Sequence, residues 1–210
     1  MTTERVAQLR ERANKSLEAF GPAAETAELF KELVRLEPGD ALAWFNWGDS
    51  LRSIGRFQDA KEALLTAREL MPKSRLFAVD TRLGMVFSEC GPPAEAEKWF
   101  RLATSNSECH GWVWLLRADN LMRMESFKLA RECLKTARVR GNVDLEEVLL
   151  NEALIDRCVG DYEDAAHRAK QALEIDPGYD SAKELLASLR GATEARQYVN
   201  GLGDDAESRN

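Results

Sequence analysis

The chain has 210 residues, of which 44 % are hydrophobic and 31 % are charged, a composition typical of a globular protein. Its formal net charge of −7 disfavours non-specific binding to nucleic acid or to an anionic membrane, because both require a basic protein surface. The N-terminal residues lack the apolar core of a signal peptide, and no apolar run is long enough to cross a bilayer. We therefore expect a cytoplasmic protein that binds neither nucleic acid nor membrane.

Small residues recur along the chain at a shared spacing. They form three columns, each with successive separations of 36, 34 and 35 residues: Gly48, Gly84, Ala118 and Ala153; Ala60, Ala96, Ala130 and Ala165; and Ala67, Ala103, Ala137 and Ala172. Two antiparallel helices approach closely only where neither carries a large side chain, so these columns predict repeated helix pairs. Gly48 should face Ala60, which lies twelve residues further on in the second helix of its pair.

Glycine and proline residues divide the predicted pairs. Gly21, Gly55, Gly91 and Gly160 each lie between two amphipathic runs, where we expect a left-handed backbone that ends the first helix. Pro38, Pro72 and Pro177 follow the second helices and prevent them from continuing. In chain order, the predicted repeats are 7–40, 41–74, 77–110, 111–144 and 146–179, with a capping helix at about 180–190. We expect one solenoid over 1–200 and a flexible tail over 201–210.

The repeat resembles the tetratricopeptide repeat. The second unit matches that pattern best, through Trp44, Gly48, Gly55, Ala60, Ala67 and Pro72. In the first unit Asn14 and Thr26 replace the small pair, and in the fourth unit Glu125 stands where glycine is usual. The resemblance implies an all-α fold, a right-handed superhelical solenoid of about five helix pairs plus the C-terminal capping helix.

The resemblance also implies a function. Proteins of this family bind a partner protein or peptide in a concave groove lined by the first helix of each pair. Carried over to this sequence, the candidate partner-binding residues are Phe45, Asn46, Asp49, Arg52, Arg82, Met85, Trp112, Leu116, Asp119, Met122, Arg123, Asn151 and Arg157. The fourth unit is the most suggestive, because Trp112, Leu116 and Met122 lie together at helical spacing where a purely structural face would seldom be so apolar.

One alternative function remains open, and a second is disfavoured. The chain could instead be a self-assembly module, for example a homodimer, which would bury the groove or the terminal helices. Binding of the acidic tails of heat-shock chaperones is disfavoured, since Asn46 and Arg82 fit the family's carboxylate clamp but Glu11 would repel the ligand.

Catalysis has little support in the sequence. There are two histidines, His110 and His167, and neither a glycine-rich phosphate loop nor a nucleophile elbow is present. Four cysteines, Cys90, Cys109, Cys133 and Cys158, lack the paired spacing of a zinc site, so we expect free thiols. The sequence predicts a non-catalytic protein without metal or cofactor.

Overall fold

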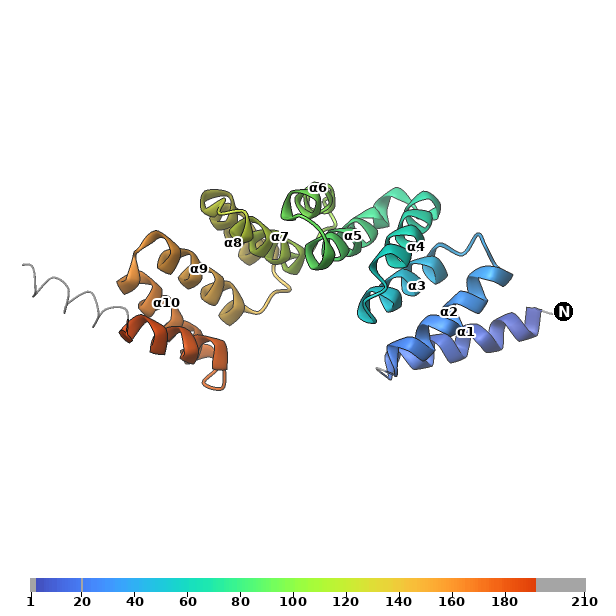
Figure 1. Ribbon diagram of the computed structural model, residues 1–210, viewed down its shortest axis with the longest axis horizontal. Helices are drawn as coiled ribbons and strands as arrows, with labels where there is room; N and C mark the ends of the chain where they lie inside the picture. Colours follow the sequence, from blue (N-terminus) through green and yellow to red (C-terminus); the bar gives the residue numbers. More distant parts are fainter. Residues whose placement is uncertain (1–2, 20, 192–210) are drawn as a thin grey trace, which may run out of the picture. The chain divides into compact units, whose positions relative to one another are not determined.

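Helices follow one another in pairs along the chain (Figure 1). The computed structural model describes residues 3–19 and 21–191. The first helices of the pairs are α1 (Thr3–Glu18), α3 (Ala41–Ser53), α5 (Leu76–Cys90), α7 (Gly111–Arg123) and α9 (Leu145–Val159). The second helices are α2 (Ala23–Leu36), α4 (Phe57–Leu70), α6 (Pro93–Thr104), α8 (Phe127–Arg140) and α10 (Tyr162–Ile175). A short 3₁₀ turn, η1 (Lys73–Arg75), precedes α5.

The predicted capping helix is confirmed, since residues 180–191 are helical. Its buried residues Ala182, Leu185 and Leu189 pack with those of α9 and α10. The predicted tail, 201–210, lies outside the described residues. The chain divides into two units, Met1–Cys109 and His110–Asn210, which we call unit 1 and unit 2. Their combination into one solenoid remains a prediction.

The predicted columns of small residues form the core of the pairs. All eight alanines of the second and third columns are 0 % exposed, as are Ala118 and Ala153 of the first. A Cβ added to Gly48 would lie 2.7 Å from Cγ of Leu64 and 3.2 Å from the carbonyl oxygen of Ala60. Gly84 has the same relation to Phe100, whose ring carbons would lie 2.7 Å from an added Cβ. Glycine is therefore required because a large side chain of the second helix occupies its Cβ position.

In the first pair the prediction for the small-pair positions holds for Thr26 but is wrong for Asn14, which is exposed, whereas Ala13 beside it is 0 % exposed. Thr26 is 2 % exposed, and its hydroxyl lies 2.7 Å from that of Ser16 and 3.2 Å from the carbonyl oxygen of Pro22. The buried hydroxyl is thus hydrogen-bonded, which avoids the cost of burying an unpaired polar group.

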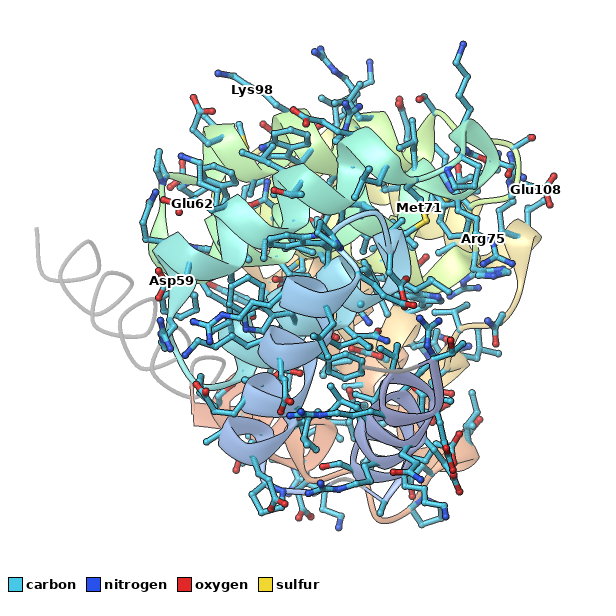
Figure 2. All side chains as sticks on the ribbon, turned by 90° about the vertical axis from the view of Figure 1, so that its right-hand side faces the viewer. Asp59, Glu62, Met71, Arg75, Lys98 and Glu108 are labelled. Atoms are coloured by element: carbon cyan, nitrogen blue, oxygen red, sulfur yellow. The ribbon has the colours of Figure 1, made fainter. Side chains whose placement is uncertain are left out.

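The outer faces of the second helices are solvated. Arg56 pairs with Asp59 at the start of α4, and Lys98 pairs with Glu95 on α6. Figure 2 shows Asp59 and Lys98 at the edge of the molecule, with Lys98 directed away from the helices. Such exposed pairs contribute little to stability. The charged residues on these faces keep the protein in solution and do not pack against another helix.

The turn that ends the first helix was predicted correctly at some repeats and wrongly at others. Gly55 and Gly160 have positive φ angles of 77° and 90°. Gly91 has a φ of −132° and is extended. This glycine precedes Pro92, whose ring disfavours a helical conformation in the residue before it. Pro92 is the N-cap residue of the next helix, α6.

The side chain of Ala60 has no room to grow, which gives a first prediction. Ala60→Leu should overpack the contact between α3 and α4 and lower the free energy of unfolding by about 1–3 kcal/mol. Urea denaturation measures this, and Glu69→Leu, at an exposed position of the same helix, is the control. If both variants unfold like the unsubstituted protein, the alanine column does not limit the packing.

Glu125 has a φ of 56° at the position where other repeats have a left-handed glycine. A side chain is strained there, so Glu125→Gly should raise the free energy of unfolding by about 1 kcal/mol. The greater backbone freedom of glycine in the unfolded chain subtracts from this gain. The reverse change at an equivalent turn, Gly160→Ala, should lower it by a similar amount. Urea denaturation of both variants gives the two signs, and equal signs would contradict the expected strain.

Candidate partner-binding surfaces

In unit 1 the candidate residues of α3 and α5 are joined by ion pairs. One carboxylate oxygen of Asp49 lies 3.1 Å from Nε of Arg52 and 3.0 Å from Nε of Arg82. Arg52 also reaches Glu89 on α5, at 2.6 Å. We call this group, Asp49, Arg52, Arg82 and Glu89, the paired-charge surface. Its charges balance within the protein itself.

Apolar side chains border the paired-charge surface. The guanidinium of Arg82 lies 5.7 Å from the ring centroid of Phe45, and Nη1 of Arg82 lies 3.6 Å from the sulfur of Met85. Both contacts hold Arg82 against apolar surface, and the first is a cation–π arrangement. Asn46 is half-buried, and its carbonyl oxygen accepts a hydrogen bond from Ser50 of its own helix. All six candidates of unit 1 thus lie on these two helices.

In unit 2 the candidates on α7 differ in how far they are exposed to solvent. Trp112, Leu116 and Met122 are half-buried, whereas Asp119 and Arg123 are exposed. Met122 packs against the core shared by α7, α8 and α9. Although Asp119 is exposed, partial desolvation by the surrounding protein raises the pKa of its carboxyl, and the nearby Arg123 partly offsets this.

The two candidates on α9 differ from each other. Asn151 is only 8 % exposed, and its side-chain amide donates to the carbonyl oxygen of Glu147 in its own helix. It therefore offers a partner little surface. Arg157 is exposed and borders a cleft of about 420 Å³ between α9 and the helix at 180–191. The lining of this cleft, which we call the α9 cleft, is Leu150, Leu154, Arg157, Ser181, Glu184, Leu185 and Ser188.

Five carboxyl groups gather near the start of α9. Burial raises the pKa of Glu147, and repulsion from Asp144, Asp119 and Glu146 raises it further. Burial also raises the pKa of the Tyr179 hydroxyl, with further contributions from Glu147, Glu146, Asp144 and Asp176. We call these carboxyl groups, Asp119, Asp144, Glu146, Glu147 and Asp176, the acidic group. Apart from Asp119, sequence reasoning missed it, although the run Asp144-Leu145-Glu146-Glu147 was a visible signal.

Other charged residues have a structural role. Asp80 of α5 is 4 % exposed and accepts a hydrogen bond of 2.6 Å from Arg68 of α4. Asp156 of α9 is 1 % exposed and pairs with Arg131 of α8 and Arg168 of α10. Each buried carboxylate therefore has a cationic partner on a neighbouring helix, which is the condition for burying a charge.

The cysteines are free thiols, with Cys109 and Cys133 buried and Cys90 and Cys158 exposed. Among residues 3–19 and 21–191, no three side chains of His, Cys, Asp or Glu are placed to hold a metal ion. Within the same ranges, no helix combines the length and the apolar character needed to span a membrane.

The repulsion at Glu147 has a consequence for stability. Its folded-state pKa lies above the ordinary value, so the carboxylate destabilises the fold as pH rises through these values. Glu147→Gln should therefore stabilise the protein at pH 7, by less than about 1 kcal/mol because the group is exposed and screened. The gain should vanish near pH 3, where the carboxyl is protonated in both states. Thermal melts at the two pH values measure the stability gained, with Glu163→Gln in the first turn of α10 as control. An equal gain from Glu147→Gln at both pH values would contradict the expected repulsion.

Comparisons with known proteins agree with this architecture. One family model, the tetratricopeptide repeat, matches residues 41–74. No curated protein sequence matches the chain. Among solved structures, MamA from Desulfovibrio magneticus RS-1 is 17 % identical with a TM-score of 0.72, over 86 % of this chain and 99 % of that one. Pseudomonas aeruginosa PilF is 22 % identical with a TM-score of 0.70, over 84 % and 78 %.

A third similar structure is YrrB, described as a TPR protein with an unusual peptide-binding site. It is 22 % identical with a TM-score of 0.63, over 81 % of this chain and 86 % of that one. At these identities the likeness concerns the fold. The tetratricopeptide repeat expected from the sequence is confirmed at residues 41–74, and the helix pairs have the fold of these solved structures.

Proposed function

We propose that this protein is a non-catalytic scaffold that binds a partner polypeptide on the surfaces of its first helices. Tetratricopeptide-repeat proteins generally mediate protein–protein interactions. In unit 2 the observation that carries the proposal is the α9 cleft, where Leu150 and Leu154 meet Leu185 in a hollow of about 420 Å³. A cleft with an apolar floor and charged residues at its border has the composition of a site for a partner's side chain.

The paired-charge surface of unit 1 supports the same function. Phe45 and Met85 present apolar surface beside Arg82, and the ion pair with Asp49 holds the Arg82 side chain in place. Side chains fixed before binding lose less entropy when a partner arrives. Both surfaces include side chains of first helices, as the family resemblance implies.

Leu154 tests the proposal. Leu154→Ala removes part of the floor of the α9 cleft and should weaken partner binding by about 1–3 kcal/mol. Leu129→Ala makes the same change on α8, where Leu129 is 49 % exposed and lies away from the cleft. Partners captured from lysate by the unsubstituted protein are quantified against both variants, beside thermal melts that check folding. Equal capture by both folded variants would place the binding surface elsewhere.

Self-assembly is the second candidate, and one observation favours it. A larger cleft, of about 670 Å³, lies between α10 and the helix at 180–191, with Tyr162, Ala166, Leu186 and Leu189 in its lining. A terminal cleft of this kind could receive a helix of a second copy. Light scattering after gel filtration decides between the two: the scaffold function predicts a monomer, whereas a dimer that Leu186→Glu disrupts would favour self-assembly.

A further inference from the structure

The acidic group differs from every other set of neighbouring charges described above. In unit 1 the carboxylates of Asp49 and Glu89 are paired with arginines at 2.6–3.1 Å. In unit 2, Arg123 partly offsets the charge of Asp119, and the other four carboxylates of the acidic group form no ion pair with a residue of the described ranges. Unit 2 therefore holds negative charge that the protein compensates only in part.

Local structure explains only part of this charge. Asp144, Glu146 and Glu147 lie at the start of α9, where acidic residues interact favourably with the helix dipole. Asp176 accepts a hydrogen bond of 2.8 Å from the backbone of Gly178 and so supports a turn. Neither explanation covers Asp119, which lies in the middle of α7 and adds to the repulsion at Glu147.

The acidic group and the α9 cleft are parts of one surface. Glu147, Leu150, Leu154 and Arg157 follow one another along α9 at spacings of three and four residues, which places them on one face of the helix. Tyr179 adjoins the second wall of the cleft, because Ser181 and Leu185 belong to the helix that follows it. Moving along α9, the surface is acidic at Glu147, apolar at Leu150 and Leu154, and basic at Arg157.

The distance along this surface is fixed by the helix. Glu147 and Leu154 are seven residues apart, which corresponds to about 10 Å of helix rise. A peptide in the polyproline II conformation, with three residues per turn and a rise of about 3.1 Å per residue, covers that distance in about three residues with both side chains on one face. A helical peptide covers it in about seven.

We propose that this surface binds a cationic partner segment, in which a lysine or arginine meets the acidic group and a large aliphatic side chain about 10 Å away enters the α9 cleft. This inference rests on the proposed function and adds the chemical class of the partner. Charge complementarity supports it, since a cation would relieve the repulsion around Glu147 and an acidic segment would increase it. Arg157, in the lining of the cleft on the side away from Glu147, favours an acidic or C-terminal group at the far end of the same segment.

Synthetic peptides test the inference on the full chain. One basic probe carries Lys-x-x-Leu in a glycine–serine background, and a second carries lysine and leucine seven residues apart in an alanine-rich helix. Each has a counterpart with glutamate in place of lysine. Fluorescence anisotropy at two salt concentrations gives Kd for the unsubstituted protein, for Glu147→Gln and for the control Glu163→Gln.

We expect a basic probe to bind at least fivefold more tightly than its acidic counterpart, with a Kd that rises with salt. Glu147→Gln should weaken that binding several-fold, Glu163→Gln should not, and neither variant should melt at a lower temperature. Leu154→Ala should weaken basic and acidic probes alike.

Two results would overturn the inference. If basic and acidic probes bind equally well and both are weakened by Leu154→Ala, the cleft binds peptides without selecting cations, and the proposed function stands alone. If neither basic probe binds, the surface does not recognise this class of segment, and capture of natural partners with Leu154→Ala then decides the proposed function separately.

Discussion

The close approach of the two helices in each pair is the constraint on which the rest of the structure depends. Leu64 and Phe100 occupy the space that a Cβ would need at Gly48 and Gly84, and the alanine columns are completely buried. This contact fixes how each first helix is rotated about its axis. Once that rotation is set, spacings of three and four residues determine which side chains face a neighbouring helix and which face a partner. The candidate surfaces are therefore consequences of the packing.

The carboxylates described above are of two kinds, those buried between helices and those of the acidic group. Asp80 and Asp156 are buried, and each is paired with arginine from a second helix. Removing one member of such a pair would leave a buried charge unpaired, so these residues are needed for the fold. The carboxylates of the acidic group are exposed or half-buried, and the charge of Asp119 is partly offset by Arg123. Nothing in the packing of α7, α9 and the helix at 180–191 requires them to lie together.

The sequence predicted the parts of the structure that arise from local periodicity. The columns, the helix pairs and the position of Glu125 in the turn could all be predicted because each depends on spacing within one repeat. The conformation of Gly91 was predicted wrongly because the repeat pattern was given more weight than the proline beside it. The acidic group and the α9 cleft were not predicted as surfaces, since they bring together Asp119, Glu147, Tyr179 and the helix at 180–191. Periodicity identifies the face of a helix, but only packing shows which faces adjoin.

The two surfaces should differ in how they gain binding energy. A ligand at the paired-charge surface has to compete with ion pairs that Asp49, Arg52 and Arg82 already make, so exchanging partners there yields little net energy. At Glu147 no internal ion pair has to be broken, and the like charges around it already oppose the folded state. A cation bound there removes an unfavourable interaction as well as adding a favourable one. Interactions that destabilise a fold are expected where function requires them. In this protein the repulsion around Glu147 is such an interaction, and it lies beside the α9 cleft.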